Sequence, residues 1–411
     1  MDNPIVVSQP AAAHPDSLYV EMVERKGRGH PDTICDALAE AFSIGLSRAY
    51  SERFGVILHH NVDKVLLKGG SSTPRLGGGE VVEPLDVFLA GRATFEADGT
   101  AIPVRDIAEQ TSRQWLRANL HALDVERHVR AHTLVRPGAP VLTALVPRTS
   151  SGRSLANDTS LGVGYAPPSQ LERVVLAVEG ALTSAATIAA NPVIGEDVKV
   201  MGVRRGDAIA LTVACAFVDR YLRGRSDYAD AKMLVAHLSD AAARQVTRHD
   251  VQVVVNAADD PSADRLYLTV TGTSAECGDD GEAGRGNRVG GLIAPYRPMT
   301  LEAAAGKNVV SHVGKTYSIV AQQIARNLVA AHPEVADATC ILVSRIGWPV
   351  ETPQVLELQI RTRADLPLEA IRERVEATAS DGMRDISRLP ELLLARASID
   401  SPATWPDVLL F

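Results

Sequence analysis

The sequence predicts an α/β or α+β fold with several layers of sheet and helix. Segments with apolar residues at helical spacing alternate with short runs of β-branched and apolar residues along the chain. The composition is that of an ordinary globular protein, since 45% of the 411 residues are hydrophobic and 22% are charged. A chain of this length and composition can bury a large core.

The N-terminal part predicts a loose arm over residues 1–17, then a helix. From Asp32 onward, apolar residues recur at helical spacing through Ile34, Leu38 and Phe42, and Gly55 marks the end of the pattern. Residues 64–70 and 84–91 read as strands, separated by the glycine-rich segment "RLGGGEVVEP".

The rest of the chain continues the alternation. Helices are expected over residues 107–125, 171–192, 227–246, 311–332 and 368–379. Strands are expected over residues 207–219, 251–259, 265–274, 338–347 and 354–360. Asn191-Pro192 should end the long helix of residues 171–192, because proline cannot continue a helix. A glycine-rich loop is expected between Glu276 and Pro295.

Charge, hydropathy and cysteine content exclude several classes of protein. The net charge of -8 argues against a nucleic-acid partner, which needs a basic surface. No apolar run approaches the roughly 20 residues that span a bilayer, and the first residues lack a secretory signal. The four cysteines lie far apart without a metal-type CxxC pair. We therefore expect reduced thiols in a cytoplasmic enzyme without a membrane partner.

The stretch "VERKGRGHPDTICDALAEAF" combines bases, two glycines and His30-Pro31-Asp32 at the start of a helix. A helix N-terminus attracts anions, because its free N–H groups carry a partial positive charge. Asp32 is out of place in an anion site unless a divalent metal ion joins it to the anion. The alternative is that Asp32 only caps the helix and that His30 lies in a turn.

Two further segments carry charge among glycines. "CGDDGEAGRGNRVGG", residues 277–291, fits a ligand-wrapping loop or a structural turn, and its glycine spacing excludes a dinucleotide-binding fingerprint. "AAAGKNVVSHVGKTYS" has Val309 where a P-loop needs glycine, but it brings Lys307, His312 and Lys315 near a helix start. Asp158 lies in a turn of small residues, and Lys199 in "GEDVKVMG" is either a ligand or a solvated surface lysine.

These motifs, in this order, resemble the archaeal-type methionine adenosyltransferase (S-adenosylmethionine synthetase) family from about Tyr19 to the C-terminus. The resemblance is carried by "ERKGRGHPDTICDALAEA", "ILHHNVDKVLLKGG", "GGGEVVEP", "NDTSLGVGYAP", "GEDVKVMG", "GDDGEAGRGNRVGGLIAPYRPM" and "EAAAGKNVVSHVGKTY". It implies formation of S-adenosylmethionine, phosphate and diphosphate from ATP, L-methionine and water. The methionine sulfur attacks C5′ of ATP, and the tripolyphosphate that leaves is then hydrolysed. Mg²⁺ is the implied cofactor, with K⁺ as a further candidate ion.

The resemblance also implies site residues, motif by motif. The catalytic set is His30, Lys199, Arg285 and Lys307, which also bind ATP phosphates together with Asp279 and Lys315. The implied methionine-binding set is Glu80, Asp158, Asp279 and His312. Asp32 is expected to bind Mg²⁺, and Asp63 is expected in a cation site or in a structural role. Arg25, Lys26 and Arg28 receive no role and are expected outside the site.

Some positions depart from the family pattern. Gly286 stands where the bacterial and eukaryotic branch has a phosphate-binding lysine, and Gly314 stands near that branch's second metal aspartate, so the second Mg²⁺ ligand has no assignment. Gly290 and Val309 replace the asparagine and proline expected in the archaeal type. These two changes motivate an alternative function: a relative that uses another nucleotide or a methionine analogue. A non-catalytic homologue is a third possibility, but the site motifs are intact.

The implied architecture is three similar sheet-plus-helix subdomains interlaced in sequence. Residues 1–18 would be an arm and residues 19–411 a single catalytic unit. The implied assembly is a homodimer with active sites at the subunit interface, and the sequence leaves open whether dimers pair into tetramers.

Overall fold

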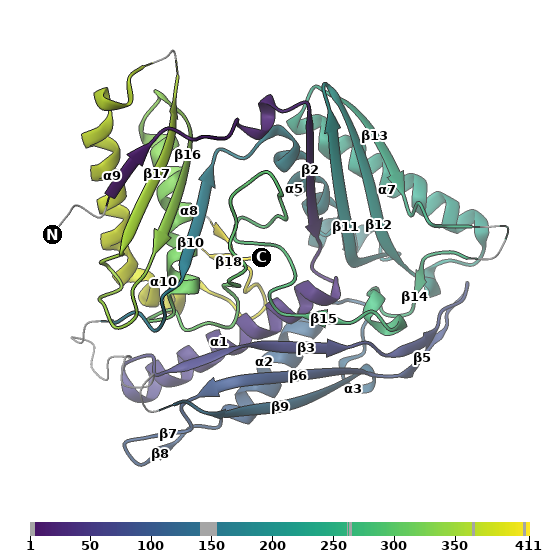
Figure 1. Cartoon of the computed structure of the whole chain (residues 1–411). Helices are drawn as coiled ribbons and strands as arrows, with labels where there is room; N and C mark the ends of the chain where they lie inside the picture. Colours follow the sequence, from purple (N-terminus) through teal and green to yellow (C-terminus); the bar gives the residue numbers. More distant parts are fainter. Residues whose placement is uncertain (1–4, 140–153, 261, 263–264, 364–365, 406–407) are drawn as a thin grey trace.

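Three β-sheets, each covered by helices on one face, make up the protein (Figure 1). The structure is a computed structural model that describes residues 5–139, 154–260, 262, 265–363, 366–405 and 408–411. Sheet I has the strand order β1 (Ile5–Ser8), β17 (Val355–Thr362), β16 (Val335–Val343) and β10 (Leu161–Ala166). Sheet II has the order β13 (Asp250–Val255), β12 (Ala208–Val218), β11 (Ile194–Arg205) and β2 (Val20–Lys26), and β14 (Leu268–Thr269) also pairs with β12. Sheet III has the order β15 (Gly281–Glu282), β3 (His60–Lys68), β6 (Leu85–Ala93) and β9 (Val129–Pro137).

The three sheets share one pairing pattern. Along the four-strand path of each sheet, one edge strand pairs in parallel with its neighbour and the other two pairings are antiparallel, while β14 adds a further parallel pairing in sheet II. The parallel pairs are β1 with β17, β13 with β12, and β9 with β6. The antiparallel edge strands are β10, β2 and β15. This common pattern confirms the mixed α/β fold of three similar units that the sequence resemblance implied.

Two long helices cover the buried face of each sheet. They are α8 (Val313–Ala331) and α9 (Arg372–Arg384) for sheet I, α5 (Gln170–Leu182) and α7 (Arg225–Val246) for sheet II, and α1 (Pro31–Phe54) and α2 (Val104–Asn119) for sheet III. The smaller elements are α3 (Val125–His128), α6 (Ala185–Ala190), α10 (Leu389–Arg396) and three two-stranded pairs: β4 (Ser71–Thr73) with β5 (Glu80–Glu83), β7 (Glu96–Ala97) with β8 (Thr100–Ala101), and β18 (Thr404–Trp405) with β19 (Val408–Leu409).

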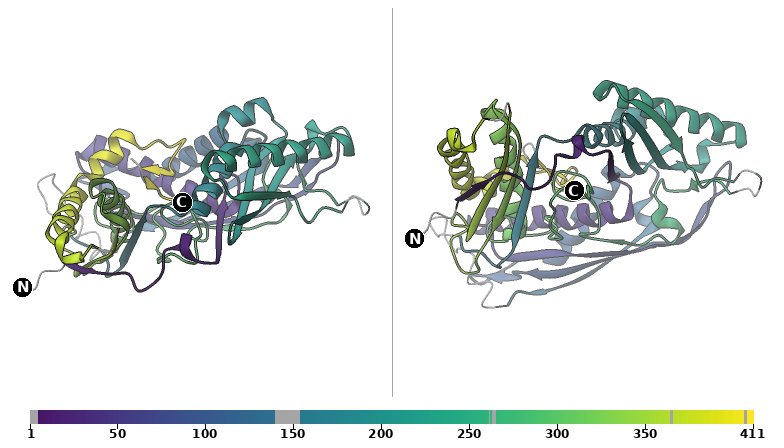
Figure 2. Two further views of the ribbon diagram at one scale, coloured as in Figure 1. Left: turned by 90° about the horizontal axis from the view of Figure 1, so that it is seen from above. Right: turned by 45° about the horizontal axis from the view of Figure 1, so that its top comes forward.

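The chain passes repeatedly between the three units. The strand β2 belongs to sheet II, yet it leads directly into α1, which covers sheet III. The strand β15 then returns to sheet III from a segment far along the chain, just before α8 covers sheet I. Figure 2 shows the three sheet-plus-helix units around a shared centre, where these crossings lie. The units are therefore interlaced and cannot be cut apart at one linker.

The helix α1 lies at the centre of the molecule, and its ends carry the residues that are typical of helix ends. Pro31 occupies its first position, where the absent N–H costs nothing, and Gly55 ends it in the left-handed conformation at φ 70°. Its side chains are buried over almost every turn, among them Ile34, Leu38 and Phe42. The predicted helix is confirmed, and its N-terminus is held between sheets II and III by Gly29 N–H to Glu196 O and by Glu282 N–H to Asp32.

Three predicted elements differ from the structure. The long helix of residues 171–192 is two helices, because Ser184 accepts the N–H of Thr187 and so caps a new start. The strand expected over residues 265–274 shrinks to Leu268–Thr269. The arm is not loose over Ile5–Ser8, which form the parallel edge strand of sheet I.

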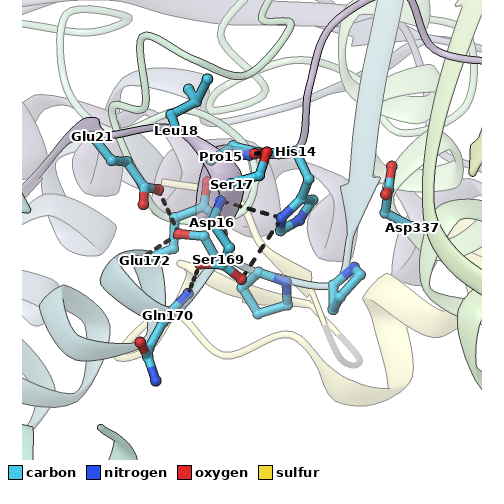
Figure 3. Close-up of polar contacts among 12 residues, drawn as sticks. His14, Pro15, Asp16, Ser17, Leu18, Glu21, Ser169, Gln170, Glu172 and Asp337 are labelled. Carbon is cyan, nitrogen blue, oxygen red and sulfur yellow. Dashed lines mark hydrogen bonds and ion pairs between the residues drawn. The ribbon is translucent and has the colours of Figure 1, made fainter. Parts of the chain in front are cut away.

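The segment between β1 and sheet II is fastened by polar contacts (Figure 3). The buried Arg204 donates hydrogen bonds to the carbonyl oxygens of Pro15 and Leu18 and forms an ion pair with Glu21 at 3.2 Å. Ser169 donates to Glu21 at 2.6 Å. These contacts order the N-terminal segment on its way from sheet I to sheet II.

Candidate active site

The turn between β2 and α1 positions His30. The side chain of His30 caps α1, because its Nδ1 accepts the N–H of Asp32 at 3.2 Å. A neutral imidazole that accepts through Nδ1 carries its proton on Nε2. Gly29 lets this turn approach β11, since a Cβ there would lie 2.4 Å from the backbone nitrogen of Asp197. The imidazole is thus held with a donor N–H on its far side.

Several charged residues lie near His30 and influence the pKa of its imidazole. Burial lowers the pKa of His30 to about 4, and the positive charges of Lys26 and Lys199 act in the same direction, whereas Asp32 and Asp279 oppose them. His30 is therefore neutral at neutral pH. The structure brings together four of the predicted site residues at this point, since Asp32, Lys199 and Asp279 all lie within electrostatic range of His30.

Asp32 is not the helix cap of the alternative interpretation, because His30 caps α1 from the turn that precedes it. Its Oδ1 accepts the N–H of Glu282 at 3.0 Å, and its Oδ2 accepts a hydrogen bond from Lys26 Nζ at 2.8 Å. Burial raises the pKa of Asp32, but these hydrogen bonds outweigh it and hold the pKa below its ordinary value. Asp32 is thus an ionised, largely buried carboxylate two residues from His30.

Two more carboxylates continue from Asp32 along the same face of α1. Asp36 Oδ1 accepts the N–H of Gly284 at 2.8 Å, and Glu40 Oε2 accepts the N–H of Gly306 at 2.9 Å. The spacing of four residues places these acids one above another on a helix. This acidic stripe, defined as Asp32, Asp36 and Glu40, fixes both glycine-rich segments against α1. Sequence reasoning missed Asp36, although its spacing from Asp32 in "HPDTICD" was the available signal.

The loop that carries Arg285 is fixed while the Arg285 side chain is exposed. Arg288 donates hydrogen bonds to the carbonyl oxygens of Gly284 and Gly286, and Lys26 Nζ donates to the carbonyl oxygen of Arg285 at 3.1 Å. A Cβ at residue 286 would lie 2.7 Å from Asp36 Oδ2, so a larger residue there would displace the Asp36 carboxylate. The arrangement presents a guanidinium on an ordered backbone, as a ligand-binding loop requires.

Lys307 lies in a second cluster of site residues. Its Nζ donates to the carbonyl oxygen of Ala303 at 2.6 Å and lies 3.2 Å from both Asp63 and Glu302. His312 lies beside it, and burial together with the charge of Lys307 lowers the pKa of His312 to about 3. His312 Nδ1 is buried without a hydrogen-bond partner among the described residues. Sequence reasoning missed Glu302, which no spacing signal linked to Lys307.

Lys315, which the resemblance places at the phosphates, is engaged within the protein in this structure. Its side chain is 0% exposed, and Nζ donates to both carboxylate oxygens of Glu40 at 2.7 Å and to the carbonyl oxygen of Lys307 at 2.8 Å. All three ammonium hydrogens are therefore used. Lys315 is a structural partner of the acidic stripe.

Lys26 was expected outside the site, yet it contacts two of the predicted site residues. Its ammonium contacts Asp32 and the backbone of Arg285, as described above. Arg25 and Arg28 point elsewhere, as expected. Arg25 pairs with Glu179 at 2.5 Å, and Arg28 donates to Asn119 and to the carbonyl oxygen of Thr183.

Glu80 and Asp158 lie at the surface, away from the described contacts of His30. Glu80 starts β5 and is exposed, and the preceding turn is held by Asp219, whose Oδ2 accepts the N–H groups of Arg75 and Gly79 at 3.1 and 2.7 Å. Asp158 is exposed, but its neighbour Asn157 accepts the N–H of Val313 at the start of α8. The structure thus places Asp158 near His312 and leaves Glu80 apart.

The donor set fits a Mg²⁺ ion that is shared with phosphate. No group of three or more His, Cys, Asp or Glu that could hold a metal occurs within the described ranges. However, Mg²⁺ commonly binds one or two carboxylates and completes its shell with phosphate and water. Asp36 Oδ2 is buried without a hydrogen-bond partner in the described part of the chain, one helical turn from Asp32. Asp63 likewise has a buried Oδ1 without a hydrogen-bond partner among the described residues, but Lys64 and Lys307 contact its Oδ2 at 2.6 and 3.2 Å.

Gly290 and Val309, the two departures from the archaeal-type pattern, lie outside these contacts. Val309 is 1% exposed and belongs to the hydrophobic core. Gly290 has φ 101°, and its N–H donates to the carbonyl oxygen of Leu409 at 2.8 Å. Both positions therefore serve packing and backbone conformation in this structure.

A neutral histidine at a helix start, ionised carboxylates and several cations together define the class of this site: its chemistry suits a metal-complexed polyanion. The family model of S-adenosylmethionine synthetase (AdoMet synthetase) matches residues 3–397. A probable S-adenosylmethionine synthase of Aquifex aeolicus is 48% identical over 373 residues, which cover 90% of this chain and 92% of that protein. An S-adenosylmethionine synthase of Aeropyrum pernix is 46% identical over 396 residues, covering 95% and 97%. The chain belongs to the S-adenosylmethionine synthetase family.

A solved structure supports the fold, and the named relatives support the function. An unusual S-adenosylmethionine synthetase from Campylobacter jejuni superposes with a TM-score of 0.63 at 14% identity, covering 93% of this chain and 91% of that chain, which supports the fold. Relatives named as S-adenosylmethionine synthases over nearly their whole length favour this function over another nucleotide or a methionine analogue. Among the described helices, none is long and apolar enough to cross a membrane.

Proposed function

We propose that this protein is a methionine adenosyltransferase that forms S-adenosylmethionine, phosphate and diphosphate from ATP, L-methionine and water, with residues 19–411 as one catalytic unit. The observation that carries the proposal is the grouping of His30, Asp32, Lys199 and Asp279 at the start of α1. Sulfur attack on C5′ expels tripolyphosphate, so catalysis depends on positioning and on stabilising a polyanionic leaving group.

His30 is suited to the leaving-group side of this reaction. Its neutral ring carries the proton on Nε2, while Nδ1 is held by the backbone of Asp32. An N–H donor aimed at the oxygen that leaves C5′ stabilises charge as it develops in the transition state. His30 therefore acts by hydrogen bonding, with its ring orientation fixed by the helix.

Lys199, Arg285 and Lys307 would bind the phosphate chain, and Asp279 would contact the nucleoside and methionine. Lys199 is 41% exposed and contacts Glu24 at 3.4 Å, so its ammonium is free to reach a ligand. Arg285 offers a planar guanidinium that can bind two phosphate oxygens. Lys307 is nearly buried and would have to exchange Asp63 or Glu302 for phosphate.

Asp32 would hold Mg²⁺, with the free oxygen of Asp36 one turn away as a further ligand. Bound there, the ion neutralises phosphate charge and orients the chain for tripolyphosphate release. K⁺ is an additional candidate ion, but Asp63 is a poor site for it, because two ammonium groups already contact its carboxylate.

Methionine binding by Glu80, Asp158 and His312 is best explained by a homodimer. Glu80 and Asp158 are exposed and do not contact the His30 group within the described chain, which fits active sites completed by a second subunit. The sheet faces opposite the helices also carry exposed apolar side chains, which favour an interface. These are Met22, Leu66, Leu134, Leu161 and Val254, on strands of all three sheets. Pairing of dimers into tetramers would need another surface.

A cytoplasmic location is supported by the cysteines, because all four are free thiols and three of them are buried. The function is tested by incubating purified protein with ATP, methionine, Mg²⁺ and K⁺. We expect S-adenosylmethionine, phosphate and diphosphate in equal amounts. Protein that binds ATP but forms no S-adenosylmethionine would contradict the proposal.

A further inference from the structure

Lys26, the last residue of β2, is held by hydrogen bonds of both its backbone and its side chain. Its backbone N–H and C=O are both held by the side chain of Asn287, at 2.9 and 2.8 Å. Its ammonium lies 2.8 Å from Asp32 and 3.1 Å from the carbonyl oxygen of Arg285. The side chain is 14% exposed. Lys26 is therefore fixed between the carboxylate expected to bind metal and the loop expected to bind phosphate.

A second lysine lies directly opposite on the neighbouring strand. Lys26 pairs with Lys199 in the antiparallel register of β2 and β11, so both side chains lie on the same face of sheet II. Like charges at directly opposite positions destabilise a sheet. Both lysines also act on the His30 imidazole, which is 20% exposed. A polyanion bound beside His30 would turn this repulsion into attraction for both ammonium groups.

The contact of Lys26 with Asp32 has a consequence for metal binding. Asp32 Oδ1 is used by the backbone of Glu282, so Oδ2, which accepts from Lys26, is the oxygen left for a cation. An ammonium group and a metal ion compete for it, because both need the same lone pairs and negative charge. When metal binds Asp32, the ammonium of Lys26 has to find another anion.

We propose that Lys26 is a phosphate-binding residue that exchanges Asp32 for the triphosphate of the nucleotide when Asp32 takes the metal ion. This inference rests on the proposed function. It supplies a cation beside Arg285, in the part of the site where Gly286 has no side chain. The ion pair of the free protein thus holds the lysine in place and keeps its charge compensated until the metal-bound nucleotide arrives.

The exchange predicts effects of opposite sign on two ligands in the variant Lys26→Met. Binding of tripolyphosphate without divalent metal, measured by calorimetry in the presence of EDTA, should weaken about 10- to 100-fold, as expected for loss of a charge-assisted hydrogen bond. Binding of Mn²⁺ without nucleotide, measured by electron paramagnetic resonance, should tighten several-fold, because Asp32 no longer has a competing cation. Lys26→Arg should retain most of the tripolyphosphate affinity.

Two other results would overturn the inference. If Lys26→Met binds tripolyphosphate as tightly as the unmodified protein, Lys26 does not contact phosphate. If both affinities fall together, the lysine has only a structural role in shaping the site. Circular dichroism and thermal unfolding of each variant show whether a loss of binding reflects a loss of fold.

The matched control is Lys232→Met. Lys232 lies on α7, which packs on sheet II, and forms a comparable partly buried ion pair with Asp259 at 2.6 Å. Loss of this ion pair should leave the affinities for tripolyphosphate and Mn²⁺ unchanged. The two ligand measurements use neither methionine nor turnover. If the unmodified protein fails to bind tripolyphosphate at all, the proposed function fails, whereas equal binding by the protein and its Lys26→Met variant refutes only the role of Lys26.

Discussion

Single residues show how burial decides the role of a charged group. His30 and Lys315 were both expected at the phosphates from their motifs, yet only His30 lies at an open position beside other site residues. Lys315 is enclosed and uses all its donors within the protein. Lys26 is the opposite case. Its motif suggested no role in the site, but its ammonium donates a hydrogen bond to Asp32. Residue type and motif indicated which residues could bind phosphate, but the neighbouring sequence did not show which partners each residue contacts.

Replacement of His30 tests its role at the leaving group. We expect His30→Ala to bind ATP with little change and to lose about 100-fold or more in kcat, because a donor that acts in the transition state contributes most to the chemical step. The measurement is S-adenosylmethionine formation at saturating substrate, together with ATP affinity by calorimetry. His14→Ala is the control, since His14 lies in the N-terminal segment. An unchanged kcat in His30→Ala would exclude the role.

Replacement of Lys315 tests its structural role. Lys315→Met should destabilise the protein by about 3–5 kcal/mol, because it leaves the buried charge of Glu40 without a partner. The double variant with Glu40→Gln should recover part of this loss, since glutamine still accepts the N–H of Gly306 without a charge. Chemical denaturation of both variants provides the comparison. A single variant as stable as the unmodified protein would contradict the structural assignment.

At the scale of elements, helices and turns serve as supports for the site. The acidic stripe of α1 holds two glycine-rich segments that come from distant parts of the sequence. Similarly, Asp219 follows β12 and holds the turn before Glu80 through two backbone N–H groups. The glycines allow the close approach, while the carboxylates supply the order. The glycine-rich character was visible in the sequence, but its anchoring partners were not.

Loss of the Asp219 anchor should affect methionine more than ATP. We expect Asp219→Ala to raise the KM for methionine about tenfold with a smaller change in kcat, because the turn that precedes Glu80 loses the carboxylate oxygen that accepts two of its N–H groups. Initial rates measured against each substrate separate these effects. Asp240→Ala, on the surface of α7, is the control. Equal changes in the KM values for ATP and methionine would indicate general destabilisation.

At the scale of the whole molecule, three sheets of one pairing pattern leave their open faces to solvent. On sheet III, Leu66, Phe88 and His132 lie in one row across β3, β6 and β9. The rings of Phe88 and His132 stack with centroids 4.6 Å apart, and Leu66 is 47% exposed. Apolar and aromatic side chains on an open sheet face are the features that a second subunit would cover.

A charge placed in this row tests the proposed dimer. Leu66→Lys should shift the protein from dimer to monomer, because a charged, strongly hydrated ammonium group would replace an apolar side chain at the interface. Light scattering after size-exclusion chromatography measures the mass. Activity should fall with it, since active sites at the interface need both subunits. A Leu66→Lys protein that remains dimeric would place the interface elsewhere, and Met233→Lys on α7 is the matched surface control.

The sequence by itself determined the α/β class, most helices and the site motifs, because these depend on local periodicity and on residues close together in the chain. It failed where a cap intervened, as at Ser184, and where a short pattern lacked pairing partners, as in residues 265–274. Only the tertiary structure decided which charges meet. Ion pairs and backbone anchors join residues hundreds of positions apart, such as Lys315 with Glu40 and Asp32 with Glu282. Whether a lysine faces a ligand or a buried carboxylate follows from the packing of interlaced units, which local sequence does not specify.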